Sequence, residues 1–226
     1  MENNLELIKL NNGLTLILDP SPWYTSVSVV AYVGIGAKHE EDSQAGLSHL
    51  LEHLVFKGTR SFPTSREVSD QIESVGGRLD AFTAYDYSGY FAKVPRSQVE
   101  IALKVLLELI YQPLLRHDDM LREKEVIYDE LRLRRDSPED LSDLILVETL
   151  WSKGYLSRDL GGTPETVASL SLGELSEFHQ RFYKTPNITF VISGAFQKER
   201  VLELLEKLPS QDFSPVNKDF SCEFSG

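Results

Sequence analysis

The 226-residue sequence contains a single cysteine, no long apolar run and no cluster of basic residues. Cys222 alone cannot form an internal disulfide bond, and this favours a reducing compartment. It is also too isolated to belong to a thiolate metal cluster. No stretch approaches the roughly 20 apolar residues of a membrane-spanning helix. Residues 1–4 are acidic and polar and resemble neither a secretory signal nor a transit peptide. We therefore expect a cytoplasmic protein without a membrane partner.

Positive charge is also scarce, since 23 Lys and Arg are outnumbered by 35 Asp and Glu, giving a formal net charge of −12. A strongly acidic chain without a basic run is a poor nucleic-acid binder, so we expect no nucleic-acid partner. The charge can steer basic peptides toward the protein, but it is equally what an ordinary solubilising surface provides. Apolar residues make up 41% of the chain, and 226 residues can hold one large domain or two small ones, with a sizeable core.

The segment His49-Leu50-Leu51-Glu52-His53 has the clearest chemical meaning. Two histidines four residues apart on a helix project from the same face, so two imidazoles can bind one zinc ion. Glu52 borders that face and can reach a water on the metal without binding the metal. The order His-x-x-Glu-His is the inverted form of a common zinc-protease motif. The alternative is an amphipathic helix whose histidines line its polar edge and whose core residues are Leu47, Leu50, Leu51 and Leu54.

Two histidines alone would hold zinc weakly, so the motif requires a third protein ligand. The best candidates lie in the highly charged segment 122–131, where Glu123 and Glu130 are two helical turns apart on one face. Carboxylates that point inwards are costly without a cation, and a metal ion removes that cost. Most glutamates on a charged helix are nevertheless solvated and paired with a nearby Lys or Arg. Periodicity alone cannot choose between Asp129 and Glu130.

Apolar and β-branched runs predict strands at residues 5–10, 14–18, 25–33, 78–84, 87–94 and 188–193. The first two are separated by Asn11-Asn12-Gly13, which is a hairpin signal. Residues 152–163 contain three glycines and are expected to be irregular, as is the tail from Pro209.

Apolar periodicity predicts helices at residues 45–57, 64–75, 97–111, 118–135, 137–151, 164–168, 172–183 and 197–208. Thr64 and Glu67 have the spacing of a capping box, and Asp118 or Asp119 is expected to cap the long charged helix. Strand pairs beside runs of helix are typical of an α+β domain. We therefore predict one domain over residues 1–226, with helices packed on a mostly antiparallel sheet and the metal-motif helix facing the charged helix.

Residues 49–59, followed at a distance by Glu123 and Glu130, resemble the inverzincin zinc peptidases, the family of pitrilysin, insulin-degrading enzyme and mitochondrial processing peptidase. Residues 161–165 and 183–187 also match landmarks of that family. The resemblance implies the N-terminal catalytic domain of a zinc-dependent metalloendopeptidase, which hydrolyses extended peptides through a water that the metal activates.

The resemblance also implies roles for single residues. His49, His53 and Glu130 would bind one Zn²⁺ per chain, because Glu130 lies where the family has its third ligand. Glu52 would be the general base that takes the proton of the water and passes it to the leaving amine. Glu123 would be a second catalytic residue, which orients the ligands through hydrogen bonds.

Residues 76–83 resemble the family's edge strand, whose backbone pairs with an extended substrate. This implies a substrate-binding role for Asp80, Ala81, Phe82 and Thr83, with Asp80 standing where the family frequently has Asn. Backbone pairing would hold a peptide extended without demanding much of its side chains.

Proteins of this family are built from two or more homologous domains of about this size that close around the peptide. The sequence resembles only the first of them, so we expect the other wall to come from a second homologous domain, a partner subunit or a homo-oligomer. By itself the domain is expected to bind zinc but to cleave peptides poorly.

Other interpretations remain open. A non-catalytic or truncated family member would act as a binding or assembly subunit, although such proteins typically lose motif residues and here all are present. The S-ribosylhomocysteine lyases carry His-x-x-Glu-His on a similar fold, but they are shorter and use a cysteine ligand, for which Cys222 is a poor candidate. A metal-free interaction domain is a further alternative, and Mn or Co could serve ligands similar to those of zinc.

Overall fold

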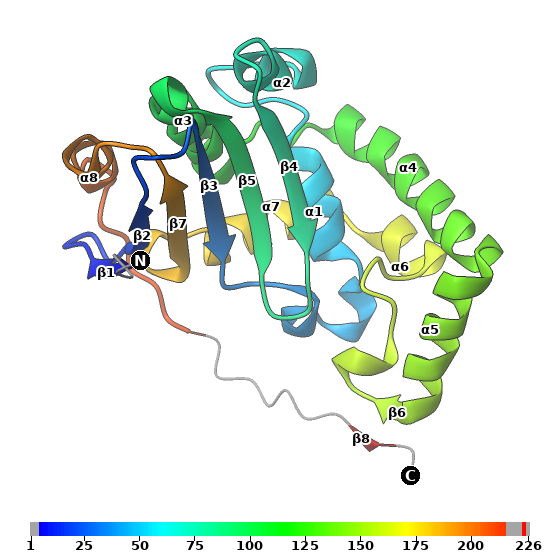
Figure 1. The fold of residues 1–226 in the computed structure, drawn as a ribbon. Helices are drawn as coiled ribbons and strands as arrows, with labels where there is room; N and C mark the ends of the chain where they lie inside the picture. The colour runs from blue at the N-terminus through cyan, green and yellow to red at the C-terminus, as the bar shows by residue number, and fades with distance from the viewer. Residues whose placement is uncertain (1–4, 216–222, 225–226) are drawn as a thin grey trace.

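The computed structural model describes residues 5–215 and 223–224, and its centre is a six-stranded sheet (Figure 1). The strand order is β1-β2-β7-β3-β5-β4. Neighbouring strands run antiparallel except β2 and β7, which are parallel, so the prediction of a mostly antiparallel sheet is confirmed. The strands are β1 Glu6–Lys9, β2 Thr15–Pro20, β3 Ser26–Val33, β4 Arg78–Thr83, β5 Ser88–Pro95 and β7 Ile188–Gly194.

The alternation of side chains explains why one face of the sheet is buried. Successive residues of a strand point to opposite faces, so each strand contributes one row of side chains to the core. In β3 every second residue is buried and the residues between them are half-buried. β7 shows the same alternation. Burying each large aliphatic side chain in these rows stabilises the fold by about 1.5–3 kcal/mol.

Helices cover the buried face, and Figure 1 shows α1 and α7 behind the sheet with α4, α5 and α6 beyond its β4 edge. α1, α3 and α7 contribute apolar side chains to the core that the strands also line. This arrangement confirms the predicted α+β class. The helices are α1 Leu47–Val55, α2 Ser65–Glu73, α3 Val99–Tyr111, α4 His117–Asp136, α5 Pro138–Leu150, α6 Pro164–Ser169, α7 Leu172–Phe182 and α8 Lys198–Glu206.

Local signals in the sequence were reliable with two exceptions. The capping box of α2 is formed, since the Thr64 side chain accepts a hydrogen bond from the Glu67 N–H and the Glu67 carboxylate accepts one from the Thr64 N–H. The predicted cap of α4 is wrong, because α4 begins at His117 with Arg116 as its N-cap residue. Asp118 and Asp119 lie instead in the first turn, where a negative charge still complements the helix dipole.

The second exception is the glycine-containing segment 152–163, which is not wholly irregular. Its start belongs to a short strand, β6 Trp151–Lys153, which pairs with β8 Glu223–Phe224. The tail from Pro209 is therefore not wholly irregular either, since β8 lies within it. A short 3-10 helix, Tyr155–Ser157, follows. Cys222 lies outside the described residues. Among the described residues, no helix combines the length and the apolar character that crossing a bilayer demands.

The start of α1 is fixed by a close approach of two glycine-containing segments. Gly46, the N-cap residue of α1, has a φ of 93° in the left-handed region. A Cβ atom at this position would lie 2.4 Å from the carbonyl oxygen of Gly161, so only glycine fits. The segment that leads into α6 is thereby packed against the beginning of α1.

We predict that Gly46→Ala destabilises the fold more than Gly76→Ala does. Both glycines have positive φ values, which cost an alanine roughly 1–2 kcal/mol, but a Cβ atom on Gly76 would meet nothing within 4 Å. The clash with Gly161 should add about 1–3 kcal/mol at position 46. Urea unfolding followed by circular dichroism measures both variants, and equal losses would contradict the steric argument.

Candidate metal centre

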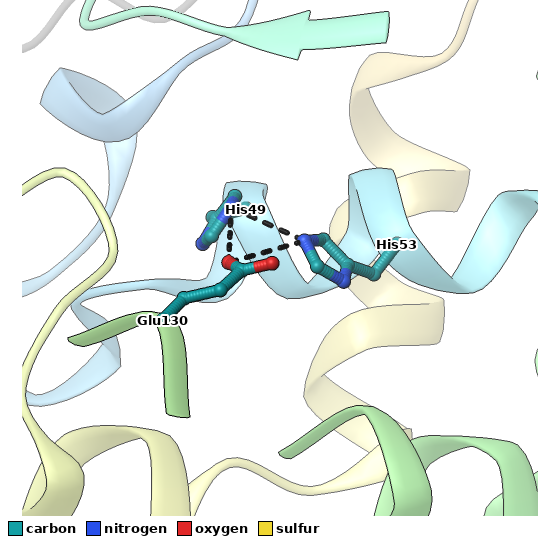
Figure 2. Close-up of side chains that lie close together, drawn as sticks. All are labelled: His49, His53 and Glu130. Atoms are coloured by element: carbon teal, nitrogen blue, oxygen red, sulfur yellow. Dashed lines mark hydrogen bonds and ion pairs between the residues drawn. The ribbon is translucent and has the colours of Figure 1, made fainter. Parts of the chain in front are cut away.

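Three polar side chains from two helices converge on one another (Figure 2), and one of these helices, α1, contacts the edge strand β4. His49 and His53 project from one face of α1, and Glu130 reaches them from α4. Each of the three offers a ligand atom within 4.8 Å of the others. The two Nε2 atoms are 3.2 Å apart, and the Glu130 Oε2 atom lies 3.6 Å from His49 Nε2 and 3.7 Å from His53 Nε2.

These distances fit a zinc ion. The circle through the three ligand atoms has a radius of about 2.0 Å, which matches the Zn–N and Zn–O distances of zinc proteins. Two nitrogens and one carboxylate oxygen are the donor set of a common class of catalytic zinc site, which keeps a further position open. The Glu130 side chain is 42% exposed, so the site is accessible on that side.

The structure also shows which of Asp129 and Glu130 faces the two histidines, a choice that the sequence pattern could not make. The Asp129 side chain is 74% exposed and pairs with Arg132 on the same helix at 3.5 Å. Glu123 and Ile127 are buried on the side of α4 that faces the core, and Glu130 continues the same stripe. Helix geometry therefore turns Glu130, and not Asp129, toward the two histidines.

A hydrogen-bonded chain behind His53 orients its ring. The Glu123 Oε2 atom lies 3.1 Å from His53 Nδ1, and its Oε1 atom lies 2.7 Å from Lys57 Nζ. A carboxylate on Nδ1 fixes the ring and leaves Nε2 free to point at Glu130. Glu123 was identified by resemblance, but Lys57 was missed, because its contact with Glu123 joins the turn after α1 to α4 and leaves no local pattern.

His49 is held differently from His53. Its Nδ1 atom is buried without a hydrogen-bond partner in the described structure, so the ring is held by packing and by the contacts of its Nε2 atom with His53 and Glu130. The pKa of His49 is lowered to about 4, mainly by burial, with smaller contributions in the same direction from His53 and Arg134. The ring is therefore neutral at pH 7, which is the form that binds a metal ion.

Glu52 lies on α1 beside the three converging residues and is not one of them. Its Oε2 atom accepts a hydrogen bond from the Thr83 hydroxyl at the end of β4. Burial raises the pKa of Glu52, while the Thr83 hydrogen bond and the charge of His53 oppose this. A carboxylate with a raised pKa beside a metal-binding group is the usual setting of a general base.

The predicted substrate strand is at the edge of the sheet. β4 pairs with β5 on one side and ends the six-stranded sheet on the other, and it also contacts α1. The Ala81 N–H donates to the neighbouring Asp80 side chain, whose other oxygen accepts from Arg78. Residues 80–83 therefore lie along an open edge next to Glu52, where an extended chain could add to the sheet.

Glu40 is a buried carboxylate at the N-terminus of α1 that the sequence did not reveal. Its two oxygens accept hydrogen bonds from the backbone N–H groups of Gly46 at 3.0 Å and Ser48 at 2.7 Å. These are among the N–H groups that a helix leaves without intrahelical partners. Burial raises the pKa of Glu40 to about 7, against the lowering effect of its hydrogen bonds and of Arg158.

We predict a pH-dependent difference in stability between the wild type and Glu40→Gln. Folding raises the pKa of this carboxyl group from 4.5 to about 7. The group therefore stabilises the folded state at low pH, and this stabilisation is lost as the pH rises from 4.5 to about 7. The wild type should therefore lose on the order of 1–3 kcal/mol relative to the variant. Urea unfolding of the zinc-depleted proteins, at pH 4.5 and at about pH 7, measures this difference in the free energy of unfolding. Glu41→Gln, at the exposed neighbour, controls for charge, and a difference independent of pH would contradict the assignment.

Comparisons with known proteins place the chain among peptidases. A family profile described as Insulinase (Peptidase family M16) matches residues 16–164, and one described as Peptidase M16 inactive domain matches residues 169–212. The Bacillus subtilis (strain 168) protein named Uncharacterized zinc protease YmxG is 31% identical over 183 residues, covering 81% of this chain and 44% of that protein. A Mycobacterium leprae (strain TN) protein, Uncharacterized zinc protease ML0855, is 31% identical over 198 residues, covering 88% and 44%.

Solved structures agree with the sequence comparisons. The periplasmic protease PqqL from Escherichia coli matches with a TM-score of 0.88 and 25% identity, over 99% of this chain and 26% of that chain. Pitrilysin has the same fold, with a TM-score of 0.82 and 22% identity, over 94% and 24% of the two chains. The chain spans about half the length of the curated relatives it matches. It belongs to the M16 family of peptidases.

Proposed function

We propose that this chain is the zinc-binding catalytic domain of a metalloendopeptidase that hydrolyses extended peptides. The supporting observation is the triangle of His49 Nε2, His53 Nε2 and Glu130 Oε2, which matches the size of a zinc coordination sphere and adjoins the Glu52 carboxylate. The names of the curated relatives support zinc as the metal. One Zn²⁺ per chain is the proposed cofactor.

Bound by His49, His53 and Glu130, zinc would supply Lewis acidity, which polarises the scissile carbonyl and makes water a better nucleophile. Glu52 takes the proton of the attacking water and then delivers it to the leaving amine. Because burial raises its pKa, the Glu52 carboxyl gains and loses a proton more readily near neutral pH than an exposed glutamate does. Glu123 keeps His53 in its working orientation through Nδ1.

The edge strand β4 is the proposed substrate-binding element. An extended peptide that adds to β4 gains main-chain hydrogen bonds from the edge formed by Asp80, Ala81, Phe82 and Thr83. Alternate residues of this segment offer the bonds, because the backbone groups of the others pair with β5. These bonds do not depend on the side chains of the peptide. The position of β4 beside α1 brings such a peptide next to Glu52 and the metal-binding triangle.

We further propose that a second homologous domain, a partner subunit or a second copy covers the open side of the site. The exposure of Glu130 leaves that side uncovered in this chain. The relatives in sequence and structure are longer than this chain, which covers 44–53% of four of the curated relatives. The expected cytoplasmic location remains a prediction, and one structural neighbour is described as periplasmic.

A binding or assembly subunit without activity is the alternative function. It is favoured by one observation, the match of residues 169–212 to a profile described as an inactive domain. That segment begins after Glu130 and contains none of the proposed ligands or the proposed base. The two functions differ in whether peptides are cleaved, and a variant of Glu52 distinguishes them.

We predict that Glu52→Gln strongly reduces peptide cleavage without loss of zinc. The chain is combined with a second homologous domain, and hydrolysis of a fluorogenic peptide is measured beside the zinc content. The variant keeps the shape of the side chain but cannot take a proton, so turnover should fall by about 10²–10⁴-fold. Glu125→Gln, on the exposed face of α4, is the matched control. Unchanged turnover in Glu52→Gln would refute the assigned base, and absence of cleavage by the wild type would favour the binding subunit.

A further inference from the structure

We propose that Thr83 is a positioning residue, which sets the orientation of Glu52 and links the peptide-binding edge of the sheet to the general base. This inference rests on the proposed function, because it concerns the same site. It differs from the substrate-binding role that the sequence resemblance gave to Thr83, since the side chain acts on the enzyme's own carboxylate.

The first observation is the contact itself. The Thr83 hydroxyl donates a hydrogen bond to Glu52 Oε2, across 31 positions of the sequence. Both side chains are half-buried, which limits competition from water. A carboxylate with one oxygen occupied in this way keeps its other oxygen available for a proton. The bond therefore restricts the orientation of the Glu52 carboxylate and leaves its Oε1 atom outside this contact.

The second observation is that Thr83 is itself held rigidly. Its backbone is opposite Ser88 in the β4–β5 ladder. The next residue, Ala84, donates its N–H to Tyr87 O at 2.8 Å and accepts from Ala37 N–H at 3.1 Å. Threonine is branched at Cβ, so few side-chain rotamers are available to its hydroxyl. A glutamate on a helix has several rotatable bonds, and a fixed donor restricts them.

The third observation is the direction of the side chains along β4. Thr83 is on the same face of the strand as Leu79 and Ala81, which pack against the core that includes α1. The backbone of the same strand forms the open edge. One rigid strand thus carries both the hydrogen-bonding groups for a peptide and the donor that holds the base. The distance from a bound peptide to Glu52 is thereby set by the strand.

The experiment compares Thr83→Val, which removes the hydroxyl and keeps the shape, with Thr83→Ser, which keeps the hydroxyl. The chain is combined with its second homologous domain, and kcat, KM and zinc affinity are measured on a fluorogenic peptide. Thr189→Val on β7 is the matched control, because Thr189 is a half-buried strand threonine on the opposite face of the sheet.

We expect Thr83→Val to lower kcat by about 10- to 100-fold, which corresponds to the loss of a hydrogen bond to a charged group. KM and zinc affinity should stay within about twofold, since neither the peptide edge nor the metal-binding residues change. Thr83→Ser should recover most of kcat. In the Glu52→Gln background, Thr83→Val should cause no further loss, because residues that act through one another are not additive.

The outcomes separate this inference from the proposed function. If Glu52→Gln strongly reduces cleavage while Thr83→Val keeps the kcat of the wild type, the inference is overturned and the proposed function stands. A change in KM alone would make Thr83 a substrate contact and would also overturn it. Cleavage that is unchanged in Glu52→Gln would refute both. If Thr83→Val does not fold, Thr83→Ala takes its place in the comparison. In that case, an equal loss of kcat in Thr83→Ser and Thr83→Ala would contradict the role of the hydroxyl.

Discussion

The packing of α1 against α4 is the constraint on which the rest of the structure depends. Leu50, Leu51 and Leu54 of α1 and Ile127 of α4 belong to one buried core, and this contact fixes the two helices relative to each other. Because Ile127 lies on the stripe that also carries Glu123 and Glu130, burying it places both carboxylates opposite the histidines of α1. The hydrophobic core therefore determines how the three candidate ligands are arranged.

Charges inside this contact are balanced in pairs. Glu123 is buried and would be costly alone, but the Lys57 ammonium compensates its charge, and His53 Nδ1 lies within hydrogen-bonding distance of its other oxygen. Glu130 has the two histidines beside it and is partly open to solvent. A cation at the triangle offsets the remaining negative charge, which is why this group of side chains is suited to a metal ion.

The sequence predicted features that lie within a single helix or strand better than contacts between different helices and strands. The spacing of His49 and His53 needs only one helix, and the alternation in β3 needs only one strand, so both were visible beforehand. The order of strands was not, because alternation reveals a buried face but not the neighbours of a strand. Only the resemblance indicated that residues 76–83 form the edge strand. Asp129 and Glu130 are neighbours, and only the packing of α4 separates them. Glu40, Lys57 and the Thr83 hydroxyl were missed because each acts on another segment. Resemblance, not periodicity, supplied the roles of Glu123 and Glu130.

The most direct test of the account is an equilibrium zinc titration of the protein and of Glu130→Gln against a competing chelator. If two imidazoles and one carboxylate hold a single ion, the wild type binds one zinc per chain and the variant binds it at least about tenfold more weakly. Glu125→Gln, on the exposed face of the same helix, should bind like the wild type. Equal affinities for wild type and Glu130→Gln, or no stoichiometric zinc at all, would contradict the convergence of α1 and α4 on one metal ion.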